Sequence, residues 1–209
     1  MKKKLRIAAV IFILCPTAFL YAVDAAPANL MLSPESRIYL TGNSTLHPYA
    51  STSTLTQIVA VLALGNNAVF MDIARRAPFQ KFEVTIPVKG LKSGESGLDK
   101  NMYKALKSGD APEIRFVLSH YEALPSASDS ILSYKAAGQL FIAGMQKDVV
   151  LTGTAMPSPD ALAVEGQYEL RMSDYGIKPP TLLLGAIKVA DPVVIHFHLK
   201  FVIQKGEAQ

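Results

Sequence analysis

Residues 82–116 read FEVTIPVKGLKSGESGLDKNMYKALKSGDAPEIRF, and this stretch decides the fold class. Apolar side chains alternate with mostly polar ones over residues 82–88, which is the period of a half-buried strand. Apolar residues then fall at helical spacing between 98 and 106, so we predict one short helix over residues 97–108. Alternation resumes over residues 114–118. The stretch therefore predicts a strand, a helix and a second strand.

Most of the remaining chain also has the alternation of β-strands. Residues 161–172 and 193–203 alternate most clearly, with large apolar side chains on one face and polar ones on the other. Weaker alternation covers four further segments, at residues 36–41, 51–64, 133–143 and 148–156. We therefore predict roughly eight strands with a single helical insertion in one domain. Strands of this kind can form a sandwich or a closed barrel, and their periodicity hardly separates the two.

The N-terminus has the pattern of a secretory signal peptide. Four basic residues lie within the first six positions, and residues 7–23 are almost wholly apolar. We expect cleavage after Ala25, which leaves residues 26–209 as the mature domain. The alternatives are an uncleaved membrane anchor and a lipid anchor on Cys15. Pro16 interrupts the apolar run, which is short for a membrane span, and Leu14 stands where a lipoprotein signal has a small residue.

The composition of the mature chain narrows its class further. Four of the 21 basic and one of the 17 acidic residues lie in the first 25 positions, which leaves 17 basic and 16 acidic residues. This near neutrality gives no reason to expect a nucleic acid partner. The single cysteine lies in the signal segment, so the mature chain has no disulfide and no thiol chemistry. We expect a periplasmic or secreted protein without a stable membrane span.

Four segments, taken in order, resemble the YceI-like family of secreted bacterial proteins. They are GNSTLH at 42–47, GLKSGESGLDKNMYKALKSGDAPEIRF at 90–116, GQLFIAGMQKDVVL at 138–151 and RMSDYGIKPPTLLLGAIKVAD at 171–191. The resemblance implies an all-β domain, a single eight-stranded antiparallel barrel of lipocalin-like shape that holds a polyisoprenoid or a similar long-chain lipid. The chain has Leu98 where the better-known branch favours Arg, and it has no Trp. These departures suggest that other residues bind a polar head group, or that the cavity is smaller.

Alternation assigns a set of large apolar side chains to the inner face of such a barrel. We predict that the following residues line the interior and bind the ligand: Phe82, Val84, Ile86, Phe116, Leu118, Leu170, Met172, Ile195, Phe197 and Phe201. We place Arg115, Asp174 and Tyr175 at a polar mouth, where they could contact a head group. For any single apolar residue, packing in a filled core explains the pattern equally well.

The sequence contains few signs of catalysis. Residues 94–97 lack the spacing of a nucleophile elbow, and no phosphate-binding glycine loop or carboxylate pair is present. We therefore expect no cofactor and no enzymatic activity. A second hypothesis is a filled barrel that acts as a stress or surface-interaction protein. A third is a metal-binding protein or enzyme that uses His196 and His198, which alternate on one strand face.

Overall fold

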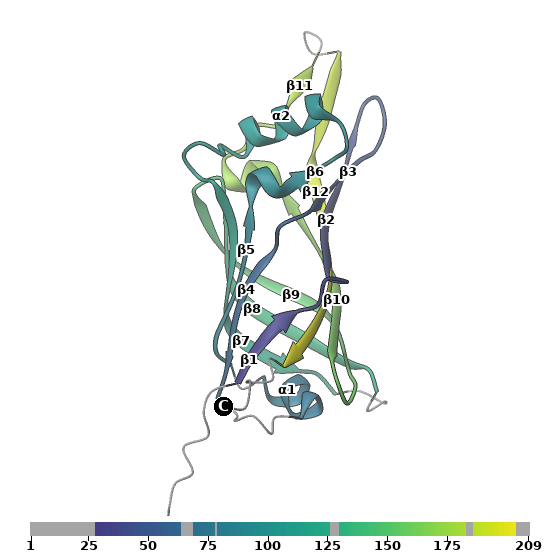
Figure 1. Ribbon diagram of the computed structural model, residues 1–209. Coiled ribbons are helices and arrows are strands. Elements are labelled where there is room, and N and C mark those ends of the chain that lie inside the picture. Colours follow the sequence, from purple (N-terminus) through teal and green to yellow (C-terminus); the bar gives the residue numbers. More distant parts are fainter. Residues whose placement is uncertain (1–27, 64–68, 78, 126–129, 183–185, 204–209) are drawn as a thin grey trace, which may run out of the picture.

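Strands form most of the structure, with short helices at its two ends (Figure 1). The computed structural model describes residues 28–63, 69–77, 79–125, 130–182 and 186–203, so the predicted signal peptide lies outside it. The elements in chain order are β1 (Ala28–Leu32), β2 (Arg37–Ser44), β3 (Tyr49–Ser53), β4 (Gln57–Leu62), α1 (Phe70–Arg76), β5 (Phe79–Pro87), the 3₁₀ helix η1 (Val88–Gly90), β6 (Leu91–Lys92), α2 (Ser96–Ala105), β7 (Glu113–Ala123), β8 (Leu132–Ile142), β9 (Met145–Pro157), β10 (Leu162–Arg171), the 3₁₀ helix η2 (Met172–Tyr175), β11 (Thr181–Leu182) and β12 (Ile187–Ile203).

Eight strand positions close into an antiparallel barrel. The strands pair in the order β1, β4, β5, β7, β8, β9, β10 and β12, and β12 pairs back onto β1. The long strand β12 makes this closure possible, because residues 189–198 pair with β2 while residues 201–203 pair with β1. Strands β1 and β2 therefore form one interrupted wall strand, and β3 and β4 form another beside it. The predicted eight-stranded antiparallel barrel is confirmed.

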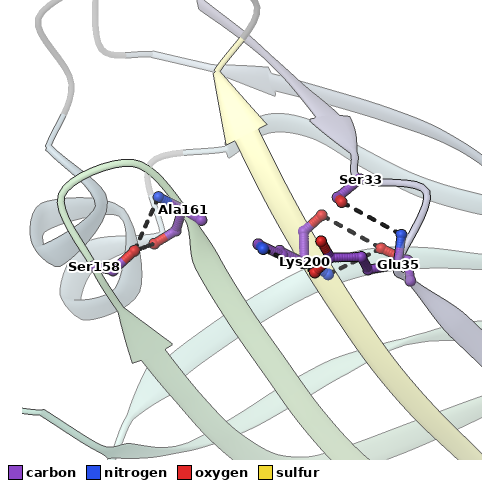
Figure 2. Close-up of polar contacts among 6 residues, drawn as sticks. Ser33, Glu35, Ser158, Ala161 and Lys200 are labelled. Carbon is purple, nitrogen blue, oxygen red and sulfur yellow. Dashed lines mark hydrogen bonds and ion pairs between the residues drawn. The ribbon is translucent and has the colours of Figure 1, made fainter.

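Polar contacts hold the interruption between β1 and β2 against β12 (Figure 2). The backbone N–H of Ser33 donates to the carbonyl of Lys200 at 2.8 Å, and the Lys200 ammonium lies 2.8 Å from the Glu35 carboxylate. The β9–β10 turn closes on itself, because the Ser158 hydroxyl donates to the Ala161 carbonyl and accepts from its N–H. These bonds satisfy backbone groups at the rim that no strand neighbour would otherwise pair.

The two helices lie at opposite ends of the barrel, and the sequence predicts only α2 (Figure 1). Helix α2 covers residues 96–105 rather than 97–108, because Lys107 adopts a left-handed backbone conformation that ends it. The expectation of a single helical insertion is corrected by α1, whose Ile73 and Ala74 are buried against the other end of the barrel. A helix of seven residues contains too little sequence for its period to stand out.

A row of small residues in the wall gives aromatic rings room inside the barrel. Gly153 on β9 pairs with Gly166 on β10, and this pair is flanked by Tyr134 on β8 and Phe197 on β12. A Cβ atom at Gly166 would collide with the Phe197 ring, and one at Gly153 would meet the Tyr134 hydroxyl. The two aromatic side chains therefore lie over the glycines, along the wall of the barrel.

We predict that Gly166→Ala destabilises the protein by about 1–3 kcal/mol, because the added methyl group collides with the Phe197 ring and with the Thr152 carbonyl. The measurement is urea unfolding followed by circular dichroism. Gly97→Ala is the matched control, since nothing lies near a Cβ atom there and alanine favours the helix by about 0.5–1 kcal/mol. Equal stability of Gly166→Ala and the wild type would contradict the packing described.

Candidate functional site

The barrel encloses an apolar cavity at the α1 end. Its volume is about 160 Å³, and Ile73 and Ala74 of α1 form part of its lining. Eight of the ten apolar residues predicted to face the interior line this cavity: Phe82, Val84, Ile86, Phe116, Leu118, Ile195, Phe197 and Phe201. The side chains on the inner faces of the strands therefore leave space between them instead of filling the barrel.

A second cavity of about 110 Å³ lies at the other end, beneath α2. We call it the upper cavity, and the cavity at the α1 end the lower cavity. Leu170 and Met172, the other two predicted residues, line it together with Leu98 and other side chains of α2. Ile114 and Ile195 line both cavities, so the two spaces lie end to end along the barrel. The structure thus places all ten predicted apolar residues at the cavities, while their role in ligand binding stays a prediction.

The two cavities together have a long lining. Along β12 it runs from Val189 in the upper cavity to Phe201 in the lower one. Twelve residue steps of a strand span about 40 Å, and the tilt of barrel strands reduces this to about 30 Å along the axis. This length is similar to the hydrocarbon thickness of a bilayer, about 30 Å. The lining is therefore long enough for the tail of a membrane lipid.

The chemistry of the lining is apolar and uncharged. Among the residues that the structure describes, no Asp, Glu, Lys, Arg or His lines either cavity. The side chains that carry a hydroxyl or an amide are Tyr49, Ser51 and Asn101 in the upper cavity and Tyr121, Tyr134 and Tyr168 in the lower one. Sequence reasoning missed Tyr49 and Ser51, because β3 is short and its sequence, YASTS, has no alternation of large apolar residues that would identify an inner face. It also missed Asn101, a polar residue of α2.

The residues predicted for a polar mouth lie elsewhere. None of Arg115, Asp174 and Tyr175 lines either apolar cavity. The Arg115 guanidinium lies over the Phe141 ring, 4.3 Å from its centroid, and 3.5 Å from the Glu83 carboxylate. Asp174 and Tyr175 line a separate polar pocket beside β9 and β10. A head-group role for these three residues stays a prediction.

The two histidines of β12 make separate contacts. His196 Nε2 lies 3.0 Å from the Thr41 hydroxyl, and its ring stacks on Tyr39 with centroids 4.6 Å apart. His198 Nδ1 lies 3.5 Å from the Glu165 carboxylate. Within the described ranges, no group of three or more His, Cys, Asp or Glu side chains is arranged to hold a metal ion.

A hydrogen bond attaches α1 to the barrel wall. The Tyr121 hydroxyl donates to the Ala74 carbonyl at 2.6 Å, and the Tyr121 ring stacks on Tyr134 with centroids 5.6 Å apart. Burial raises the pKa of Tyr121 to about 12, so the hydroxyl keeps its proton at neutral pH. The end of the lower cavity is therefore closed by a helix with a defined attachment.

Helix α2 is attached at the opposite end through polar groups. The Tyr103 hydroxyl donates to the Leu91 carbonyl at 2.7 Å, and the Lys92 ammonium donates to that hydroxyl at 2.8 Å. Asp99 accepts hydrogen bonds from the Ser93 hydroxyl at 2.7 Å and from its N–H at 2.8 Å. These two bonds lower the pKa of the Asp99 carboxyl. No residue of α2 is fully buried, so polar contacts contribute much of its attachment.

Comparison with known proteins identifies the class. The model of the YceI-like domain matches residues 44–201, so the chain belongs to this family. The resemblance predicted from the four segments is thereby confirmed. A comparison with curated protein sequences gives no match.

Solved structures confirm the fold. BcnA of Burkholderia cenocepacia is similar with a TM-score of 0.61 and 17% identity, over 79% of this chain and 95% of that one. The YceI protein of Campylobacter jejuni has a TM-score of 0.54 and 17% identity, over 74% of this chain and 84% of that one. A third structure is a polyisoprenoid binding domain from Saccharophagus degradans, implicated in plant cell wall breakdown. It has a TM-score of 0.58 and 9% identity, over 84% of this chain and 97% of that one. At these identities the similarity establishes the fold.

We predict that Tyr121→Phe costs about 1 kcal/mol of stability, because the Ala74 carbonyl loses its donor while the ring remains. Urea unfolding measures the loss, and hydrogen exchange should show it first in α1. Tyr39→Phe, on the outer wall, is the control. Unchanged exchange in α1 would contradict the attachment.

We predict that the attachment of α2 weakens in acid. A carboxyl whose folded pKa is lowered contributes stability above its ordinary pKa, about 3.9, and loses it as the pH falls through the folded value. Hydrogen-exchange protection of α2, relative to the barrel strands, should therefore fall below about pH 4. In Asp99→Asn, α2 should be less protected at pH 7 and show no further loss in acid, whereas the exposed Asp110→Asn should behave like the wild type. Constant protection of α2 in the wild type down to pH 2 would contradict the role of Asp99.

Proposed function

We propose that this protein binds a long-chain apolar ligand, a polyisoprenoid or a similar lipid, in the barrel interior. The observation that carries the proposal is the pair of uncharged apolar cavities that share Ile114 and Ile195. Each methylene buried in such a space contributes about 0.8 kcal/mol, so a long chain binds well with few polar contacts. The polyisoprenoid binding domain among the structural neighbours supports the same ligand class.

The cavities favour this function over a barrel filled by its own side chains. In a filled barrel, large residues such as Phe197 would meet across the axis, and the outer surface would carry the function. Here the Phe197 ring lies over Gly166, and the space that it leaves belongs to the lower cavity. A binding protein needs this kind of interior, with a few polar groups for orientation.

The protein acts, in this proposal, as a non-enzymatic carrier in the periplasm or outside the cell. The signal pattern over residues 1–25 supports export. Within the described part of the chain, no helix has both the length and the apolar character needed to cross a membrane. In the described part of the chain, no carboxylate, amine, guanidinium, imidazole or thiol side chain lines either cavity.

The proposal predicts that filling the lower cavity blocks binding. Ala136→Phe places a ring in the cavity, whereas Ala137→Phe places the same ring on the other face of β8. We expect Ala136→Phe to weaken binding of the branched alcohol phytanol by at least tenfold, and Ala137→Phe to change it less than twofold. Displacement of the neutral dye N-phenyl-1-naphthylamine measures the affinity.

Both variants must unfold cooperatively on heating, which shows that the barrel is intact. If the folded Ala136→Phe variant bound phytanol as tightly as Ala137→Phe, the ligand would not occupy the cavity. If neither phytanol nor the corresponding hydrocarbon, phytane, displaced the dye from the wild-type protein, the carrier proposal itself would be wrong.

A further inference from the structure

Ser51 is a buried polar side chain without a partner. It is 1% exposed, and its hydroxyl has no hydrogen-bond partner among the described residues. Buried hydroxyls are nearly always hydrogen-bonded in proteins, because leaving one unpaired is costly. Ser51 is among the residues that line the upper cavity, so a group bound there could become the partner of its hydroxyl.

Two further polar side chains line the same cavity. Tyr49 lies two residues earlier on the same strand, so it shares the inner face with Ser51. Asn101 comes from α2, which covers this end of the barrel. Burial raises the pKa of Tyr49, so its hydroxyl remains neutral and able to donate. The three side chains supply hydroxyl and amide groups, which act as both donors and acceptors.

We propose that Ser51, with Tyr49 and Asn101, binds an uncharged, oxygen-bearing head group of the ligand, such as a hydroxyl or a carbonyl, beneath α2. This inference rests on the carrier function proposed above and adds the orientation of the ligand. The head lies in the upper cavity and the apolar tail extends past Ile114 and Ile195 into the lower cavity.

The lining also decides against a charged head group. A buried phosphate or carboxylate needs a cation or several donors to offset the loss of its hydration. Among the described residues, no Lys, Arg or His lines either cavity. The lower cavity also has hydroxyls, from Tyr121, Tyr134 and Tyr168, and Tyr121 already donates to Ala74. Among the described residues, Ser51 in the upper cavity has the buried side-chain oxygen without a partner.

A matched series of ligands tests the proposal: phytanol, phytane and phytanyl phosphate, compared by displacement of N-phenyl-1-naphthylamine. The wild-type protein should bind phytanyl phosphate at least tenfold more weakly than phytanol. Ser51→Ala should weaken the binding of phytanol about fivefold, because one hydrogen bond is lost, and it should leave the binding of phytane unchanged. Ser53→Ala is the control, because this serine lies on the same strand, accepts a hydrogen bond from Thr56 and lines neither cavity.

Stability separates a binding role from a structural one. Removing an unpaired buried hydroxyl should leave the melting temperature of the ligand-free protein unchanged or raised. A clear fall in the melting temperature of Ser51→Ala would show that the hydroxyl has a structural partner, and would overturn the proposal.

The outcomes also separate this proposal from the carrier function. If Ser51→Ala changed the binding of phytanol and of phytane equally, the head-group site would be wrong while the carrier function stands. A preference of the wild-type protein for phytanyl phosphate would have the same meaning. Failure of both phytanol and phytane to bind would overturn the two proposals together.

Discussion

Space inside the barrel is the constraint on which the rest of this structure depends. Eight strands enclose an interior that side chains can just fill, so a cavity persists only if large residues are kept from the axis. The wall achieves this with glycines at inward positions of three neighbouring strands, Gly138, Gly153 and Gly166. The rings of Phe116 and Phe197 lie over two of these glycines. The aromatic residues that a sequence reader would assign to a filled core thus become the walls of a cavity.

The two ends of the barrel are attached to its wall in different ways. Helix α1 combines the buried side chains of Ile73 and Ala74 with the hydrogen bond from Tyr121. Helix α2 has no buried residue, and hydrogen bonds of Tyr103 and Asp99 attach it. Segments held by few buried contacts open at lower free-energy cost than core strands. A ligand as long as the proposed lipid needs such an opening, and the polar group Ser51 lies just beneath the more exposed of the two helices.

The sequence predicted most of the wall and helix α2, but it missed helix α1 and strand β1, for physical reasons. In β10 and β12 most inner residues are large and apolar and most of their neighbours are polar, so Leu170 and Phe197 could be placed by alternation alone. Helix α1 and strand β1 are too short to show a period. The space around Gly166 depends on Phe197, thirty-one positions away in sequence, and no local pattern reports that pairing. Ser51 was missed because an unpaired hydroxyl is a property of its surroundings.

Native mass spectrometry of the protein purified from a bacterial periplasm, followed by solvent extraction, tests the central claim most directly. The account predicts a stoichiometric adduct that extracts as a neutral long-chain lipid, or a protein that takes up one such molecule when phytanol is added. A protein that remains ligand-free by mass, and stays so after incubation with phytanol and phytane, would contradict it.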